Sequence, residues 1–186
     1  MPIAPPIPGV WPPSLFDDAG RCGSSDAWSA FHVRPRCEKI VSQRLREDGS
    51  LGYFLPLSVQ EKRYQRRRID VQSLLFPGYV FVHGDHELIR LSQFRIPGVV
   101  KCLDEPNQKS LHKSLLALQA LIECGAAITP EQRLEPGMAV EITGGPLAGR
   151  RGVVIENKKA LRFLIQLDFI QQGVSVAVDA SIVKAL

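Results

Sequence analysis

Leu74-Leu75-Phe76-Pro77-Gly78-Tyr79-Val80-Phe81-Val82 is the stretch that decides how the chain folds. Pro77 presets φ at the second position of a turn and Gly78 accepts a positive φ at the third, so a turn is predicted ahead of a strand. Along that strand Tyr79 and Phe81 share one face and the two valines share the other. Because both faces are apolar, two interpretations stay open: a central strand covered on both sides, or one side left for a partner.

The residues around this stretch predict further strands and helices. Residues 28–33 predict a strand. Pro35 suits the first turn of the helix that follows, where its missing N–H does no harm, and Gly49 is a plausible C-terminal stop. Asn107 is a good N-cap for a later helix with apolar residues on one face. Together these elements predict an α+β domain, an antiparallel sheet with flanking helices, over residues 28–124.

A cluster of cations lies between the helix and the opening stretch. Five of the seven residues from Lys62 to Arg68 are cationic. The run is too short and too unperiodic for an amphipathic helix, so we expect an exposed hairpin or loop. Such a cluster repels itself unless it is solvated or matched by phosphates, and both alternatives stay open. Its candidate nucleic-acid-binding residues are Lys62, Arg63, Arg66, Arg67 and Arg68.

The two ends of the chain differ in composition from its middle. Residues 1–27 are rich in Pro, Gly, Ser and Asp, which predicts a flexible tail. Residues 125–135 carry little apolar pattern and predict a linker. Over residues 136–186 apolar residues alternate strictly, and five short strands of this kind close most economically as a small barrel. The sequence therefore predicts two domains.

The net charge of +4 is unevenly distributed. Residues 28–125 hold fifteen cationic and ten anionic side chains, residues 1–27 hold one and three, and residues 126–186 hold seven and six. The excess positive charge lies in the middle segment, which indicates an anionic partner there.

Patterns for catalysis or metal binding are weak. The four cysteines are widely spaced without a Cys-x-x-Cys pair, which predicts reduced thiols. His83 and His86 lie three apart, but no further ligands follow at metal spacing. No phosphate-binding Gly-rich loop followed by Lys-Ser or Lys-Thr is present. We therefore expect a binding protein without a cofactor or a metal ion, and not an enzyme.

Targeting signals are weak as well. No apolar run approaches the roughly 18 residues of a membrane span. The proline-rich start has neither the cationic beginning nor the apolar core of a signal peptide. These features favour a cytoplasmic location.

Several segments form an ordered set of motifs. They are the strand that opens at Trp28, Arg34-Pro35-Arg36-x-Glu38-Lys39, Tyr53-Phe54-Leu55-Pro56, Leu75–Val82 and Pro97-Gly98-Val99. In the second domain Gly145-Pro146-Leu147-Ala148-Gly149, continued by Gly152-Val153-Val154, looks like a KOW motif. The order and spacing of these motifs resemble the NusG/RfaH family of transcription elongation factors over residues 28–186. The resemblance implies an NGN domain followed by a five-stranded, SH3-like KOW barrel.

The resemblance also implies a function. The N-terminal domain would dock on the clamp helices of RNA polymerase, suppress pausing and promote readthrough without covalent chemistry, as a monomer with no membrane contact. The family's hydrophobic docking patch carries onto Phe76 and Tyr79, with Phe31, His32 and Phe54 as neighbours. Arg34, Arg36 and the cationic cluster would face non-template DNA or nascent RNA.

The KOW domain of the family recruits a second partner: a ribosomal protein, the termination factor Rho, or RNA. By resemblance the contact surface would include Leu147, Phe169 and Ile170. The sequence departs from the housekeeping pattern, which prefers aromatic residues around the Gly-Pro turn, and has Arg150 and Arg151 nearby. This departure favours an operon-specific antitermination paralog. Many β-branched residues in the domain favour a constitutive barrel over a helical alternative.

Two other functions stay open beside the operon-specific factor. One is a general housekeeping elongation factor, which would associate with polymerase genome-wide. The other is an RNA- or ribosome-associated module that uses the KOW barrel and the cationic cluster. The second would bind isolated RNA even after Phe76→Ala and Tyr79→Ala.

Overall fold

The structure is a computed structural model that describes residues 7–19, 26–64, 67–131, 137–157 and 160–186. The chain divides into two compact units. The first consists of Met1–Pro56 with Phe76–His112, and the second of Leu57–Leu75 with Lys113–Leu186. No helix in the described part of the chain is long and apolar enough to cross a membrane.

The first unit is built on a five-stranded antiparallel sheet with the strand order β1-β3-β6-β2-β7. Its strands are β1 (Val10–Trp11), β2 (Asp26–Val33), β3 (Gly52–Phe54), β6 (Tyr79–Asp85) and β7 (Val99–Asp104). The opening stretch supplies β6, which lies between β3 and β2 in this order. The predicted α+β architecture, an antiparallel sheet with flanking helices, is confirmed.

Among the described residues, three helices belong to the first unit, and a fourth begins in it and continues into the second unit. They are α1 (Leu15–Ala19), α2 (Glu38–Asp48), α3 (His86–Arg95) and α4 (Gln108–Glu123). The predicted end of α2 is confirmed, because Gly49 adopts a left-handed φ of 69° and donates its N–H to Leu45 O at 3.0 Å. The predicted cap of α4 is confirmed by Asn107, whose side chain accepts the N–H of Ser110 at 3.1 Å.

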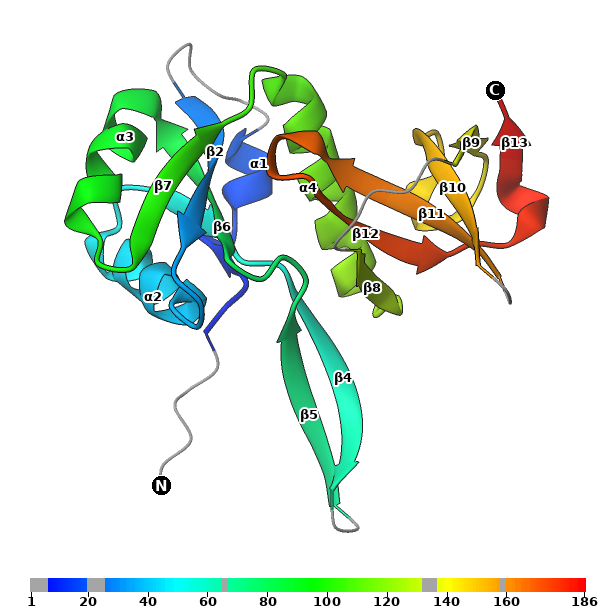
Figure 1. Ribbon diagram of the computed structural model, residues 1–186, viewed down its shortest axis with the longest axis horizontal. Helices are drawn as coiled ribbons and strands as arrows, with labels where there is room; N and C mark the ends of the chain where they lie inside the picture. Colours follow the sequence, from blue (N-terminus) through cyan, green and yellow to red (C-terminus); the bar gives the residue numbers. More distant parts are fainter. Residues whose placement is uncertain (1–6, 20–25, 65–66, 132–136, 158–159) are drawn as a thin grey trace. The chain divides into compact units, whose positions relative to one another are not determined.

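The two faces of the sheet are covered by different helices. Register pairs Val80 with Phe31, and this face packs on α2 and α3, which lie together on one side of the sheet in Figure 1. The opposite face carries Trp28, Tyr79 and Phe81, and α1 lies on that side. The predicted alternation along β6 is therefore confirmed, and Val80, Phe81 and Val82 are all fully buried.

The N-terminal segment differs from the predicted flexible tail over residues 7–19. β1 pairs with β3, Leu15 is only 3% exposed, and Phe16 stacks on Trp28 with 5.7 Å between ring centroids. These few apolar residues find a partner surface in the sheet, which composition alone does not reveal. The remaining residues of the predicted tail, 1–6 and 20–25, lie outside the described residues.

The sequence predicted a hairpin or a loop for the cationic cluster, and the structure has a hairpin. β4 (Leu57–Tyr64) and β5 (Arg67–Leu74) pair antiparallel over their whole length and make a two-stranded sheet of their own (Figure 1).

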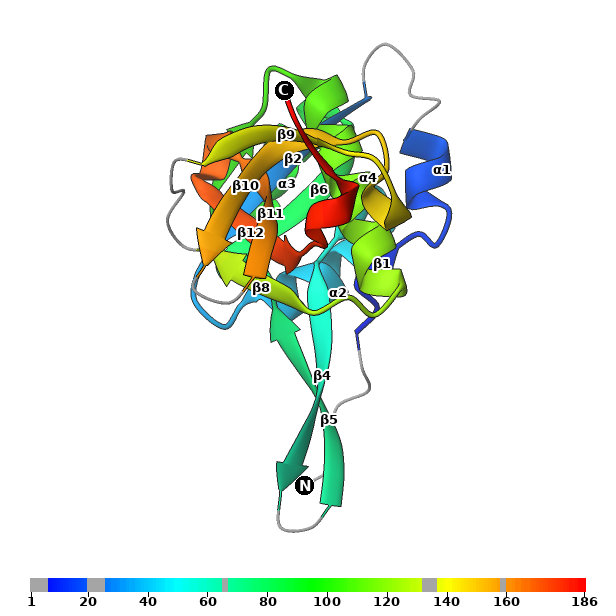
Figure 2. The ribbon, with the colours of Figure 1, turned by 90° about the vertical axis from the view of Figure 1, so that its right-hand side faces the viewer.

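The second unit contains a six-stranded sheet in the order β13-β9-β10-β11-β12-β8 (Figure 2). Its strands are β8 (Ile128–Glu131), β9 (Met138–Ile142), β10 (Arg151–Asn157), β11 (Ala160–Leu167), β12 (Gln172–Ala177) and β13 (Val183–Ala185). Three short 3-10 turns are η1 (Gly145–Leu147), η2 (Asp168–Ile170) and η3 (Ala180–Ile182). The β-rich second domain is confirmed, with six strands in place of the five expected.

The sixth strand comes from the segment predicted as a linker. β8 pairs with β12, placing Ile128 opposite Val176, and Ile128 is 3% exposed. A strand of four residues with a single large apolar side chain shows too little alternation to be recognised in sequence. Residues 128–131 thus belong to the sheet.

If β8 is part of this sheet, Ile128→Ala should lower the free energy of unfolding by about 2–4 kcal/mol, because the change leaves a cavity in packed apolar surroundings. Urea unfolding of the full chain measures the loss. Met138→Ala is the matched control, since Met138 is 64% exposed. Equal stability of the two variants would contradict the assignment of β8 to the core.

Candidate functional site

Three turns meet at one end of the first sheet. Gly78 has φ 85° and Tyr79 N–H donates to Phe76 O at 3.2 Å, which confirms the predicted turn. Gly78 O in turn accepts the N–H of Val33 at 2.8 Å, at the end of β2. Arg34 N–H donates to Gly98 O at 2.8 Å, which joins the third turn. We call this junction the sheet corner; it comprises residues 32–38, 76–79 and 97–99.

A buried carboxylate holds the sheet corner together. Glu38, the first residue of α2, is 4% exposed, and its Oε1 accepts the N–H of Gly78 at 2.9 Å. The bond joins residues 40 apart in sequence and satisfies a backbone donor that the turn would otherwise leave without a strand partner. In the sequence, Glu38 is recognisable only as part of the motif that runs from Arg34 to Lys39. The signal available was a carboxylate in the first turn of a helix, which predicts a cap and not this long-range bond.

Two aromatic side chains stand at the sheet corner on the face away from α2. Register places His32 opposite Tyr79, and their ring centroids are 5.3 Å apart. Both residues are half-buried, so part of each remains accessible to a partner. Since both backbones are fixed by the sheet and the turn, the pair is positioned before any partner arrives.

The structure corrects three of the residues predicted for the same patch. Phe31 is fully buried and lies on the opposite face, beside Val80. Phe54 is fully buried, with Phe16 edge-on at 5.1 Å between ring centroids. Phe76 is 1% exposed and packs edge-on against Phe81 at 5.6 Å. The alternation of side chains along a strand cannot distinguish core residues from docking residues, because large apolar side chains occur in both.

Positive charge lies beside the aromatic pair. Arg34 and Arg36 are exposed at the sheet corner, as predicted for a nucleic-acid contact, and Lys101 is exposed opposite His32 on β7. Arg36 has a left-handed φ of 67°, which is uncommon for a residue with a side chain.

The hairpin cations occupy successive register positions near its tip. Arg63 pairs with Arg68, Lys62 with Ile69, and Tyr64 with Arg67. Arg66 lies outside the described residues, as do the side chains of the other four predicted cations. Their role in binding nucleic acid stays a prediction.

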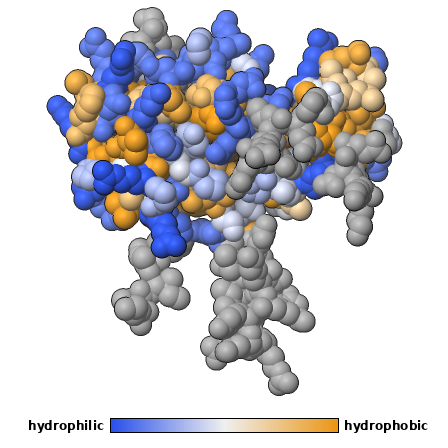
Figure 3. All heavy atoms as spheres, in the orientation of Figure 1, coloured by the Kyte–Doolittle hydropathy of each residue, from blue (hydrophilic) through white to orange (hydrophobic). Residues whose placement is uncertain are grey.

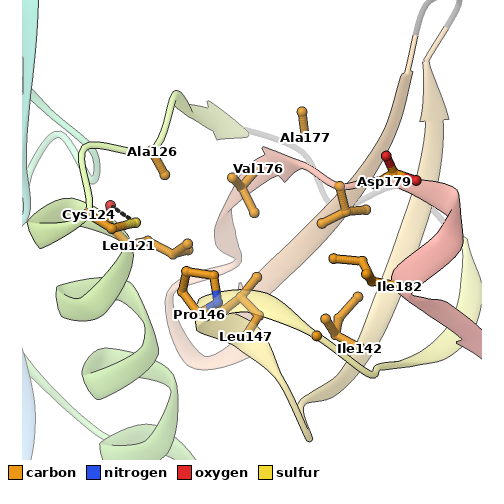
Figure 4. A pocket seen from close by; sticks show the side chains of 12 residues that line it. Leu121, Cys124, Ala126, Ile142, Pro146, Leu147, Val176, Ala177, Asp179 and Ile182 are labelled. Carbon is orange, nitrogen blue, oxygen red and sulfur yellow. Dashed lines mark hydrogen bonds between the residues drawn. The ribbon is translucent and has the colours of Figure 1, made fainter.

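In the second unit the predicted contact residues are mostly buried. Leu147 is 4% and Ile170 6% exposed, which corrects their assignment to an open surface, whereas Phe169 is half-buried. Leu147 instead lines an apolar cavity of about 180 Å³, shown in Figure 4. The cavity lies between the end of α4, at Leu121 and Cys124, and the sheet, at Ile142 and Val176. Its volume is below the roughly 300 Å³ of ordinary small-molecule pockets, so it suits an inserted apolar side chain.

A group of polar and titratable side chains lies at the other end of the Tyr79 face. Trp28 Nε1 donates to His112 Nδ1 at 3.3 Å, and the His83 ring lies 4.8 Å from the Trp28 ring. Burial is the largest influence on His83 and lowers its pKa; Asp26 opposes this and His112 adds to it. The group is a packed aromatic cluster that favours neutral imidazole.

The neighbouring polar residues Ser29 and His86 both contact one carboxylate. Asp104 accepts the Ser29 hydroxyl at 2.8 Å and lies 3.5 Å from His86 Nε2, so the carboxylate separates the hydroxyl from the imidazole. Burial, aided by Asp104, raises the pKa of Cys102 to about 11, which keeps this thiol protonated. Within the described ranges no three His, Cys, Asp or Glu side chains are grouped to hold a metal ion.

Comparison with known proteins assigns the family. The family model described as "Transcription termination factor nusG" matches residues 26–115, which include β2, α2, the hairpin, β6 and the start of α4. Residues 26–115 of the chain belong to the NusG family. NusG-family proteins are non-enzymatic transcription factors. No curated protein matches the chain.

Two solved structures are similar over most of the chain. "Domain interaction in Thermotoga maritima NusG" is 19% identical, with 87% of this chain and 97% of that chain covered and a TM-score of 0.48. "Crystal Structure of MjSpt4:Spt5 complex conformation B" is 17% identical, with 86% and 96% covered and a TM-score of 0.28.

Removal of the Glu38 carboxylate should loosen the sheet corner. Glu38→Ala leaves the buried Gly78 N–H without its acceptor, and we expect a loss of about 1–3 kcal/mol in the free energy of unfolding. Urea unfolding measures it, with the exposed Glu47→Ala of the same helix as control. Hydrogen exchange at the Gly78 amide should accelerate in Glu38→Ala only. An unchanged exchange rate would refute the role given to this carboxylate.

The aromatic cluster predicts a pH-dependent stability. Because folding lowers the pKa of His83 below its ordinary value of 6.5, the unfolded chain binds the proton more readily. The stabilisation from neutral His83 is therefore present above pH 6.5 and declines as the pH falls through that value. Wild type should lose stability between about pH 7 and pH 5, and His83→Phe should lose less. Parallel curves for the two proteins in thermal unfolding would show that His83 is not the titrating group.

Proposed function

We propose that this protein binds RNA polymerase through the sheet corner and acts on transcription elongation. The observation that carries the proposal is the half-buried His32–Tyr79 pair, held rigid by the Glu38–Gly78 hydrogen bond inside the family-matched residues. Aromatic side chains on fixed backbone lose little conformational entropy on binding, and such residues commonly dominate protein interfaces. An apolar helical surface of polymerase, such as its clamp helices, is the expected partner.

The cations around the corner support a second contact, with nucleic acid. Exposed Arg34, Arg36 and Lys101 flank the aromatic pair, and five more cations lie between Lys62 and Arg68 in the sequence. Phosphate contacts of this kind provide affinity without base choice, so either non-template DNA or nascent RNA satisfies them. At the sheet corner, polymerase and nucleic acid would contact neighbouring side chains of the first unit.

The second unit supports the more specific part of the proposal. We propose that its sheet is a KOW domain, and that a ribosomal protein or another factor inserts an apolar side chain beside Leu147 into the cavity of Figure 4. Leu147 and the adjacent Arg150 and Arg151 stand where the housekeeping pattern has aromatic residues. An operon-specific antitermination factor is therefore favoured over a general elongation factor.

Binding to purified RNA polymerase tests the function. We expect a His32→Ala/Tyr79→Ala variant to bind the elongation complex about tenfold more weakly and to lose its effect on pausing and readthrough, since each removed ring contributes roughly 1 kcal/mol or more at a docking site. Transcription in vitro on a template with a pause and a terminator provides the readout.

The control is Phe94→Ala, because Phe94 is 84% exposed on α3, away from the proposed contact. A wild-type protein that neither binds polymerase nor alters pausing refutes the proposal. Binding to isolated RNA that survives the double substitution would instead favour the ribosome- or RNA-associated function.

A further inference from the structure

The N-terminal segment, residues 7–19, occupies the same face of the sheet as the proposed docking site. Trp28, Ala30 and His32 alternate along one face of β2, with Tyr79 and Phe81 beside them on β6. His32 and Tyr79 stand at one end of that face. At the other end, the Phe16 ring of α1 lies 5.7 Å from Trp28 and 5.1 Å from Phe54.

Phe16 therefore covers aromatic surface that continues from the docking pair. Phe54 lies 6.4 Å from Phe81, and Phe81 lies 5.6 Å from Phe76, in the turn that precedes Tyr79. A connected row of rings thus runs from Phe54 through Phe81 to the turn at the sheet corner, and Phe16 of α1 joins its far end to Trp28. All residues of this row lie within the first unit.

The first part of the N-terminal segment is tied to the unit: Pro8 O accepts the Tyr53 hydroxyl, Gly9 O accepts Leu55 N–H, and Arg46 lies over the Trp11 ring. Fewer contacts hold α1. β1 makes two register pairs with β3, and α1 has five residues, too few for a helix to be stable alone in water. Leu15 is its one buried large apolar side chain among the described residues 7–19, and Phe16 is half-buried. The segment also precedes the family-matched residues, which begin at Asp26.

The N-terminal segment packs against Gly52 of β3. A Cβ at Gly52 would lie 2.4 Å from Leu15 Cδ1, 3.2 Å from Trp11 O and 3.5 Å from Pro12 Cδ. All three atoms belong to the N-terminal segment, so a methyl group here would force Leu15 to shift and would press on the backbone at Trp11. Gly52 thus provides a way to release the segment without altering it.

We propose that residues 10–19 are a displaceable cover on the polymerase-docking face. In the covered state only the His32–Tyr79 end is available; release of α1 removes Phe16 from Trp28 and Phe54 and extends the apolar surface. This inference rests on the proposed function. A cover that is closed about nine-tenths of the time lowers the apparent affinity for polymerase about tenfold, because only the open fraction binds fully.

Two independent variants of the full chain test the cover. Phe16→Ser removes its main aromatic contact, and Gly52→Ala obstructs Leu15 from the sheet side. We expect both to bind purified RNA polymerase several-fold to about tenfold more tightly than wild type in a titration at fixed salt. Phe94→Ser is the control, since it changes an exposed aromatic residue outside the cover and should bind as wild type does.

Thermal unfolding of each variant establishes that it remains folded at the temperature of the titration. Affinities equal to or weaker than that of wild type in both folded variants overturn the cover and leave the docking proposal standing. Absence of polymerase binding by every protein overturns the proposed function, and the cover with it. Tightening by Phe94→Ser to the same extent would also overturn the cover, because the gain would not depend on α1.

Discussion

The hydrogen bond from Gly78 N–H to the Glu38 carboxylate is the constraint on which the candidate site depends. It joins the first turn of α2 to the turn that begins β6, across 40 residues of sequence. Without an acceptor for that N–H, the turn would bury an unsatisfied donor, which costs more free energy than a hydrogen bond gains. The same turn sets the direction of Tyr79, and β2 sets that of His32. A buried carboxylate in the core thus controls an exposed aromatic pair.

The two faces of the first unit's sheet have different roles. Val80 and Val82 point to the side of α2 and α3, where apolar burial stabilises the unit. The opposite side is covered by α1 only in part, and it ends in the half-buried pair at the corner. Other exposed apolar residues, Leu91, Phe94 and Val100, lie on α3 and β7. In the view of Figure 3 the apolar surface is broken into small patches by hydrophilic residues, which is ordinary for a protein surface.

Sequence reasoning recovered the architecture because its signals are local. The Pro77-Gly78 turn, the Gly49 helix end and the Asn107 cap each depend on a few neighbouring residues, and all three are found. The site was recovered only in part. Phe31, Phe54 and Phe76 have the composition of a docking patch, yet tertiary packing buries them. The ordered segment at residues 7–19 and strand β8 were not predicted. Each has few apolar residues, and these pack against strands that are distant in the sequence, β3 and β12.

The most direct test of the account is hydroxyl-radical footprinting of the full chain, alone and bound to RNA polymerase. The method reports the solvent exposure of individual aromatic side chains, so it compares the two faces within one sample. We expect modification of His32 and Tyr79 to fall on binding while that of Phe94 stays unchanged. Protection of Phe94 with no change at His32 and Tyr79 would contradict the account, because it would place the polymerase contact on the helical side of the sheet.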